Sequence, residues 1–235
     1  MNDSALSKVI VALDVATIRE AEQILNSLAG RVEFVKIGMQ AFFGYGERII
    51  PYAKDRGFKV FLDLKLCDIP NTVSSAIKSL SRHKFDLLTV HISGGLEMLR
   101  SANIAIKDIL PEAGIIGVTI LTSLGEEEIS SIGYQTPMYE TIEKMIRLAC
   151  EANITGVVCS AREIERVKDI SKGGLKIITP GIRLDTDSAQ DQKRVETPRV
   201  AFLRGADYVV MGRSIINGDI QANLDRVELH LSSKE

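Results

Sequence analysis

A short run from Phe61 to Thr72 combines charged residues with the pattern of a strand. Asp63 and Lys65 are two positions apart, so on a strand their side chains share one face while leucines point to the other. Strands of buried parallel sheets are normally apolar on both faces, and buried charges are costly unless they are paired and hydrogen-bonded. A structural ion pair is one interpretation, but the pattern favours a reactive site, where local sequence rules are commonly broken.

Four charged residues are the candidates for this chemistry: Lys36, Asp63, Lys65 and Asp68. Two ammonium groups and two carboxylates can compensate one another in a cleft, and the carboxylates should keep Lys65 protonated at neutral pH. A protonated lysine beside a carbanionic centre is a proton donor. Asp63 could raise the energy of a substrate carboxylate or only fix the lysine, and the sequence leaves both roles open. Two carboxylates could also bind Mg²⁺, although two lysines already neutralise their charge.

Apolar β-branched runs alternate with amphipathic stretches along the whole chain. The runs predict eight strands, at Val9–Asp14, Val32–Ile37, Lys59–Leu66, Asp86–His91, Ile115–Thr122, Gly156–Ser160, Lys176–Thr179 and Tyr208–Met211. Helical spacing predicts eight helices, at Ile18–Leu28, Glu47–Arg56, Val73–His83, Leu96–Leu110, Tyr139–Glu151, Ala161–Ser171, Pro198–Arg204 and Ile220–Leu231. With no linker or composition break, we expect one α/β domain over residues 1–235, a (β/α)8 or TIM barrel. A doubly wound open sheet is the alternative, but no G-x-G-x-x-G follows the first strand.

Polar residues end nearly all the predicted strands, and in a barrel these ends meet at one mouth, where active sites lie. The turns after strands seven and eight are the usual phosphate site of such barrels. There, Gly181 and Gly212 allow backbone N–H groups to approach an anion, and Arg183 and Arg213 offer forked donors. The long polar segment Leu184–Val195 is expected to be a lid over the phosphate, with Gln192 reaching phosphate and ligand.

Single residues at the mouth have more than one interpretation. Asp14 can accept a hydrogen bond from a sugar hydroxyl, or cap a helix near Thr17. Thr72 is placed to cap the helix that follows it. His91 can contact a ligand, but a structural histidine is the preferred interpretation.

The bulk properties exclude several classes of protein. Net charge is −2 and no apolar stretch reaches 18 residues, which predicts neither nucleic-acid nor membrane binding. The chain begins without a basic, apolar signal segment, and its three cysteines have no metal-ligand spacing. We therefore expect reduced thiols and a cytoplasmic protein.

The run Asp63-Leu-Lys65-Leu-Cys-Asp68-Ile-Pro-Asn-Thr72 resembles the signature of the orotidine 5′-phosphate decarboxylase family. The D-x-K-x-x-D part is shared with related sugar-phosphate decarboxylases, whereas the Ile-Pro-Asn-Thr extension separates the two groups. The resemblance covers nearly the whole chain through further matching segments: Val11-Ala-Leu-Asp14, Val35-Lys36-Ile-Gly38, His91-Ile-Ser-Gly-Gly95, Gly117-Val-Thr-Ile-Leu-Thr122-Ser123, Val157-Val-Cys-Ser160, Thr179-Pro-Gly-Ile-Arg183, Asp191-Gln192 and Gly212-Arg213.

This resemblance implies a (β/α)8 homodimer that converts orotidine 5′-phosphate to UMP and CO₂, the last step of de novo pyrimidine biosynthesis, without cofactor or metal. Lys65 would then protonate C6 of the pyrimidine, and Asp63 would face the departing carboxylate. The remaining roles implied are ribose binding by Lys36 and Asp14, contributions to the partner's site by Asp68, Ile69 and Thr72, pyrimidine contacts by Thr122 and Ser123, and substrate binding at the phosphate end by Pro180, Arg183, Gln192, Gly212 and Arg213.

Two alternatives remain at this point. A metal-dependent sugar-phosphate decarboxylase or aldolase can share the D-x-K-x-x-D core, and would lose activity on chelation. A silent nucleotide-binding or scaffolding barrel would bind UMP analogues without turnover, which the intact Lys65 and its two carboxylates disfavour.

Overall fold

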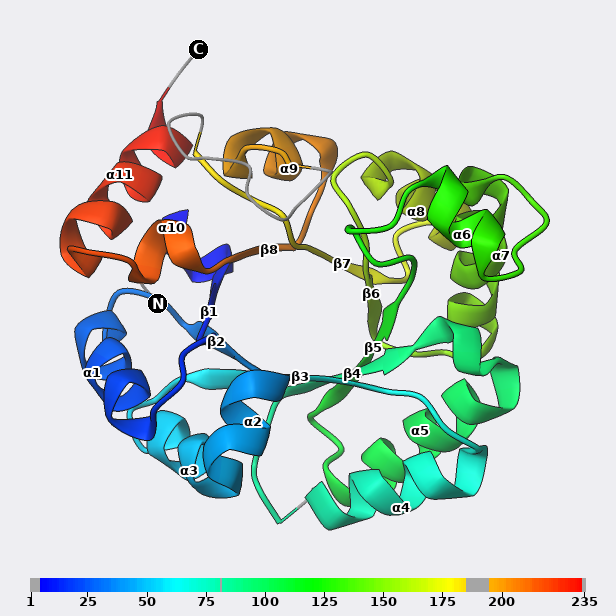
Figure 1. The fold of residues 1–235 in the computed structure, drawn as a ribbon, viewed down its shortest axis with the longest axis horizontal. Coiled ribbons are helices and arrows are strands. Elements are labelled where there is room, and N and C mark those ends of the chain that lie inside the picture. The colour runs from blue at the N-terminus through cyan, green and yellow to red at the C-terminus, as the bar shows by residue number, and fades with distance from the viewer. Residues whose placement is uncertain (1–4, 81, 185–194, 234–235) are drawn as a thin grey trace.

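In a computed structural model, which describes residues 5–80, 82–184 and 195–233, the chain forms a closed barrel of eight parallel strands (Figure 1). Each strand pairs with the next, and the last pairs with the first. The strands are β1 (Val9–Ala12), β2 (Phe34–Gly38), β3 (Lys59–Leu66), β4 (Leu87–His91), β5 (Gly114–Val118), β6 (Gly156–Val158), β7 (Lys176–Thr179) and β8 (Tyr208–Met211). The predicted (β/α)8 barrel is confirmed, and the open-sheet alternative is wrong.

Helices surround the ring of strands (Figure 1). The α-helices are α1 (Ile18–Leu28), α2 (Met39–Tyr45), α3 (Ile49–Lys54), α4 (Pro70–Leu80), α5 (Leu96–Ile109), α6 (Glu126–Ser131), α7 (Met138–Glu151), α8 (Ile164–Ser171), α9 (Pro198–Arg204), α10 (Arg213–Ile216) and α11 (Ile220–Ser232). Short 3₁₀ turns are η1 (Ala5–Lys8), η2 (Gly46–Arg48) and η3 (Ile92–Gly94). No helix in the described ranges is both long and apolar enough to cross a membrane.

Two apolar layers hold the barrel together, one on each side of the strands. Alternate residues of one strand point to opposite faces, so Val35 and Leu62 pack outward under the helices while Phe34 and Phe61 point inward. The inner layer fills the barrel with Ile10, Ala12, Phe34, Phe61, Leu87, Ile116, Ile178 and Val210. The interior is therefore a packed core that forms the floor beneath the mouth.

Several predicted boundaries were wrong, mostly at the mouth. The strand expected to reach Thr122 ends at Val118, because the chain turns there and both the amide and the hydroxyl of Thr119 donate to the carbonyl of Val158. The strands expected to end at Asp14 and Ser160 likewise stop two residues earlier. Beyond these strand ends, loop residues that line the mouth include Asp14, Thr122 and Cys159.

The helical predictions missed short pieces. Helix α2 was not predicted, because its segment holds Gly44 and is followed by Gly46, whose φ of 68° ends the helix. The helix expected at Glu47–Arg56 is instead η2 followed by α3, and the short α6 and α10 were also missed. Helix α4 begins at Pro70, which suits a first helical position because its missing N–H needs no partner. Thr72 therefore lies inside the first turn, so its predicted capping role was wrong.

Two aspartates at the face opposite the mouth, one just before β4 and one just before β8, each hydrogen-bond to the start of the preceding strand. The carboxylate of Asp86 accepts a hydrogen bond from the amide of Val60 at 2.7 Å, and its own amide donates to the Val60 carbonyl at 2.9 Å. Asp207 makes the same pair of bonds with Ile177, at 2.7 Å and 2.9 Å. Lys54 adds an ion pair to Asp86 at 2.9 Å.

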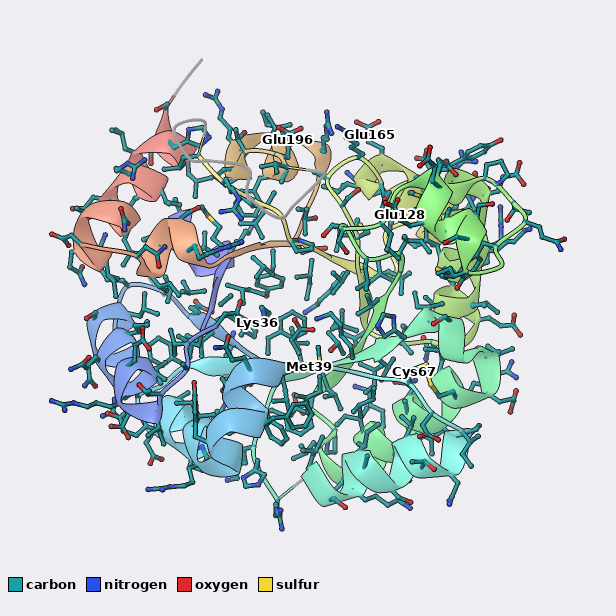
Figure 2. The ribbon with its side chains drawn as sticks, in the orientation of Figure 1. Lys36, Met39, Cys67, Glu128, Glu165 and Glu196 are labelled. Carbon is teal, nitrogen blue, oxygen red and sulfur yellow. The ribbon has the colours of Figure 1, made fainter. Side chains whose placement is uncertain are left out.

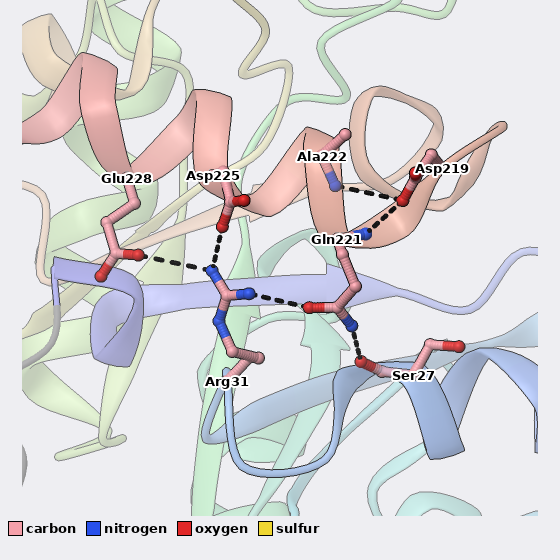
Figure 3. A network of polar contacts seen from close by, with 7 residues as sticks. All are labelled: Ser27, Arg31, Asp219, Gln221, Ala222, Asp225 and Glu228. Atoms are coloured by element: carbon pink, nitrogen blue, oxygen red, sulfur yellow. Dashed lines mark hydrogen bonds and ion pairs between the residues drawn. The ribbon is translucent and has the colours of Figure 1, made fainter.

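A polar network joins the first and last parts of the chain (Figure 3). The guanidinium of Arg31, between α1 and β2, donates to Gln221 and Asp225 at 2.7 Å each and to Glu228 at 3.4 Å, all on α11. Gln221 in turn donates to the carbonyl of Ser27 at 2.6 Å. These partly exposed bonds attach the C-terminal helix beside α1, where the barrel closes.

Replacing Asp86 by alanine should weaken the barrel measurably. The amide of Val60 would lose its side-chain acceptor and Lys54 its ion pair, which predicts a loss of about 1–3 kcal/mol in the free energy of unfolding. Urea denaturation monitored by circular dichroism measures it. The matched control is Asp108→Ala on the exposed surface of α5, expected within about 0.5 kcal/mol of the parent. Equal stability of the two variants would contradict the fixing role of Asp86.

Candidate active site

The mouth of the barrel holds a cavity of about 510 Å³, within the range of small-molecule sites. Its floor is apolar and includes Phe61, Val118 and Val210, while charged groups stand around the wall. Nine of the residues predicted for the site line this cavity: Asp14, Lys36, Asp63, Lys65, Thr122, Pro180, Arg183, Gly212 and Arg213. This cavity is thus lined by both apolar and charged side chains, which come from both halves of the chain.

The carboxylate of Asp63 is the centre of the charged wall. Its Oδ1 accepts a hydrogen bond from Lys65 Nζ at 2.8 Å, and its Oδ2 lies 3.2 Å from Lys36 Nζ. Lys36 continues to Asp14, at 3.5 Å between Nζ and Oδ1. In Figure 2, Lys36 lies inside the ring of strands. The side chains of Asp63 and Lys36 are only 11 % and 13 % exposed, so these attractions are weakly screened by water.

Mutual compensation fixes the charge states of this row. Burial alone would raise the pKa of Asp63, but Lys36 and Lys65 outweigh it and hold the pKa below its ordinary value. Burial would lower the pKa of Lys36, but Asp63 and then Asp14 outweigh it and hold the pKa above its ordinary value. Both groups are therefore ionised across the neutral range.

The end of β3 departs from regular strand geometry at Lys65. This residue has a φ of 51°, in the left-handed region that is unfavourable for a residue with a side chain. Pairing with β4 shifts in the same place, since Leu62 pairs with Leu88 while Leu66 pairs with Val90. Between these pairs, three residues of β3 lie opposite the single residue Thr89 of β4, which is a bulge. The predicted sharing of one face by Asp63 and Lys65 holds, but on an irregular backbone.

Thr89 on β4 is a polar residue of the site that the sequence reasoning missed. Its hydroxyl donates to Asp63 Oδ1 at 3.0 Å and accepts from the backbone amide of Lys65 at 2.8 Å. The residue is fully buried. A signal was available, because Thr89 is a hydroxyl residue in an apolar predicted strand, two positions before His91 and therefore on the same face.

One smaller alternative at the mouth, the cap of α1, is decided by a contact. Thr17 caps α1 itself, with its hydroxyl accepting from the amide of Glu20 at 3.2 Å, so Asp14 is not the cap. Gly38 leaves room for the Asp14–Lys36 pair, since a β-carbon there would lie 2.9 Å from Asp14 Oδ1. His91 is half-buried and outside the cavity lining, and burial, with the nearby Lys65, lowers its pKa below the ordinary value.

The opposite wall of the cavity, after β7 and β8, is suited to an anion. Arg183 is buried and lines the chamber, while Arg213 stands at its exposed edge. Gly181 has a φ of 74°, a conformation that a residue without a side chain adopts freely, and it lies beside Pro180 in the same turn. These residues come together as the sequence predicted.

Other predicted residues are not brought into this chain's own cavity. Asp68 is exposed and its carboxylate accepts from the amide of Ile69 at 2.6 Å, so Asp14 takes the place expected for Asp68 in the row of four charges. Ile69, Thr72 and Ser123 are exposed and absent from the lining. Gln192 and most of the expected lid, residues 185–194, lie outside the described residues.

A metal would find few ligands at this mouth. Within the part of the chain that the structure describes, no three His, Cys, Asp or Glu side chains are grouped to hold an ion. Around Asp63, the two ammonium groups occupy the positions that a cation would need.

Further lining residues that were not predicted are Gln40 at the start of α2 and Cys159 after β6, neither of which carried a sequence signal for this role.

A family model, related sequences and a related crystal structure all carry the name of the same enzyme family. Residues 7–224 match the family model described as "Orotidine 5'-phosphate decarboxylase / HUMPS family". Proteins named orotidine 5′-phosphate decarboxylase from Carboxydothermus hydrogenoformans and Fusobacterium nucleatum are 42 % and 43 % identical over 213 residues each, covering 89 % and 90 % of both chains. The crystal structure of that enzyme from Lactobacillus acidophilus has a TM-score of 0.85 at 30 % identity, covering 97 % of this chain and 100 % of that one.

Replacing Lys36 by methionine should cost more stability than replacing an exposed lysine. The change leaves a buried carboxylate with one cation fewer, which predicts a loss of about 3 kcal/mol, the low end for a broken buried pair because Lys65 remains. Chemical denaturation measures the loss. Lys59→Met, which removes an exposed pair with Glu33 from the same sheet, should cost less than about 1 kcal/mol.

A second substitution tests the cause of this loss. Adding Asp63→Asn to Lys36→Met should recover part of the stability, because the uncompensated carboxylate is then gone. Equal losses in Lys36→Met and Lys59→Met, or no recovery in the double variant, would show that the charges at the mouth are not energetically coupled.

Proposed function

The chain belongs to the orotidine 5′-phosphate decarboxylase / HUMPS family, and we propose that it converts orotidine 5′-phosphate to UMP and CO₂ without a cofactor or metal. The observation that carries the proposal is the compensated row Asp14–Lys36–Asp63–Lys65 on the wall of a nucleotide-sized cavity. Such a row presents an ammonium group and a fixed carboxylate to the same end of the substrate, which suits a reaction that exchanges a carboxylate for a proton.

In the proposed reaction the bond between C6 of the pyrimidine and its carboxylate breaks, and the electron pair stays on C6 as CO₂ leaves. The ammonium of Lys65 then gives its proton to C6, and solvent reprotonates the resulting amine. Asp63 supports this role because it holds the Lys65 ammonium in place through a hydrogen bond of 2.8 Å. Asp63 also faces the departing carboxylate, whose loss relieves the repulsion between the two negative groups.

The rest of the substrate would extend across the mouth toward β7 and β8. We assign Asp14 and Lys36 to the ribose hydroxyls and Thr122 to the pyrimidine, since all three line the cavity. We assign the phosphate to Arg183, Arg213 and the turn glycines, with Pro180 beside them, and we assign Gln192 to the same group. Binding at this far end contributes energy that can be used at the reacting carbon.

No delocalising cofactor is needed if the charges are fixed in advance. Donors and cations that already point to the developing negative charge stabilise the transition state without reorganising at the moment of reaction. A weakly screened wall strengthens this effect. Enzymes lower barriers by about 8–23 kcal/mol, and a carbanion on a ring carbon places this reaction toward the upper end of that range.

We further propose that two chains form a homodimer that shares its sites. Asp68, Ile69 and Thr72 follow the end of β3 in sequence, are exposed and do not line the chain's own cavity. Ile69 is 67 % exposed, so it is available for burial against a partner. In this arrangement Asp68 would complete the charged row of the neighbouring subunit.

Replacing Lys65 by alanine should abolish turnover, because no other group would deliver the proton to C6. With EDTA present, we expect the ultraviolet absorbance of the orotate ring to fall quickly with the parent protein and roughly 10⁴-fold more slowly with the variant. Lys59→Ala, which removes an exposed lysine at the other end of β3, is the matched control and should retain parental activity.

Each alternative outcome has a distinct meaning. No turnover by the folded parent protein, with or without added metal, would reject orotidine 5′-phosphate as the substrate. Turnover that EDTA removes and Mg²⁺ restores would instead indicate the metal-dependent branch of related decarboxylases.

Mixing two inactive variants tests the shared site. Lys65→Ala and Asp68→Asn, each expected to be inactive alone, should regain up to about one quarter of parental activity after subunits exchange, because half of the dimers then contain one intact site. Sedimentation velocity checks that both variants are dimers, and Asp108→Asn mixed with Lys65→Ala shows the contribution of one unaltered subunit. Absence of any recovery after proven exchange would mean that each site is self-contained.

A further inference from the structure

The geometry points to Thr89 as the positioning residue that fixes Lys65 and Asp63 relative to each other for proton transfer. This inference rests on the proposed decarboxylation and deepens it. Thr89 lies on β4 between Leu88 and Val90, the two residues that pair on either side of the bulge in β3. Its hydroxyl makes one bond to the backbone of Lys65 and one to the carboxylate of Asp63.

The first bond stabilises the irregular backbone. Inside the bulge the amide of Lys65 has no place in the ladder, and the Thr89 hydroxyl accepts it at 2.8 Å instead. A buried amide without an acceptor is costly, so loss of this oxygen favours a different backbone around Lys65. Since the residue has a φ of 51°, relaxation toward an extended conformation would redirect its side chain.

The second bond fixes the rotation of the carboxylate. Thr89 donates to Oδ1, the oxygen that also accepts from Lys65 Nζ, while Oδ2 faces Lys36. With three donors on two oxygens, the carboxyl plane has one favourable orientation. Without the hydroxyl, two flexible lysines alone would hold it, and the distance from Lys65 to the reacting carbon would vary more.

A purely structural role would not require these partners. Thr141 is another buried threonine, in the first turn of the outer helix α7, and its hydroxyl bonds to the hydroxyl and carbonyl of Thr136, just before that helix. Thr89 instead uses both capacities of its hydroxyl, donor and acceptor, on the two members of one ion pair. The charged and titratable groups facing Asp63 are Lys36 from β2, Lys65 from β3, His91 from β4 and, through Lys36, Asp14 after β1.

The test compares Thr89→Val, which keeps the shape and removes the hydroxyl, with Thr89→Ser, which keeps the hydroxyl. We expect Thr89→Val to lower kcat for orotidine 5′-phosphate by about 10- to 100-fold, while KM and the affinity for UMP change less than about threefold. Thr89→Ser should retain at least about a third of the parental kcat. The acidic limb of the kcat profile should move to higher pH in Thr89→Val, because a donor to the Asp63 carboxylate is gone.

Thr141→Val is the matched control, since it also removes a buried threonine hydroxyl with two bonds. It should lower the denaturation midpoint while kcat and its pH profile stay parental. If Thr89→Val does not fold, Thr89→Ser and Thr89→Ala provide a second pair that differs only in the hydroxyl.

Parental kcat with an unchanged pH profile in Thr89→Val would overturn the inference, as would equal kcat in the serine and alanine variants. A change in KM alone would also overturn it, because that result assigns Thr89 to binding. A folded parent protein that does not turn over orotidine 5′-phosphate would instead reject the proposed function on which the inference rests.

Discussion

The buried carboxylate of Asp63 is the constraint on which the mouth of the barrel depends. An uncompensated charge at 11 % exposure would destabilise the fold, so neighbouring strands must supply donors at fixed positions. Lys36 comes from β2, Lys65 from β3 and Thr89 from β4. Neighbouring strands of a sheet lie about 4.8 Å apart, so inward-facing residues of β2 and β4 come within reach of a carboxylate on the strand between them. The pairing of these three strands and the compensation of Asp63 are therefore coupled.

The irregular end of β3 follows from the same requirement. A regular strand would place Asp63 and Lys65 on one face, yet the bulge inserts extra residues and gives Lys65 a left-handed backbone that costs about 1–2 kcal/mol. Bonds to Thr89 and Asp63 offset this cost, and both belong to the charged network. Local strain is thus located at the residue to which we assign proton donation, and the same two residues that hydrogen-bond to Lys65 hold its backbone and side chain in place.

Residue types and alternation were enough to predict the strand order, the mouth and most of the cavity wall. Asp14, Lys36 and Asp63 were found because strand ends converge in any barrel of this kind. The bulge could not be predicted, since nothing in the letters Asp-Leu-Lys-Leu requires a positive φ at Lys65. Asp68 was expected in the chain's own network because spacing along the sequence ignores the turn after β3, where its carboxylate bonds to the amide of Ile69 instead.

The two walls of the cavity carry different charges, and this difference favours an extended, phosphorylated substrate. Charges that compensate one another stand on β1 to β3, whereas Arg183 and Arg213, after β7 and β8, form a cationic wall suited to an anion. A ligand that fills only one wall contacts either the two arginines or Lys65, the proposed proton donor. A nucleotide can span both, so binding energy from the phosphate can hold the base against a charged row that would otherwise repel an anionic carboxylate. Selection for substrate and assistance to the reaction therefore arise from one arrangement of strand ends.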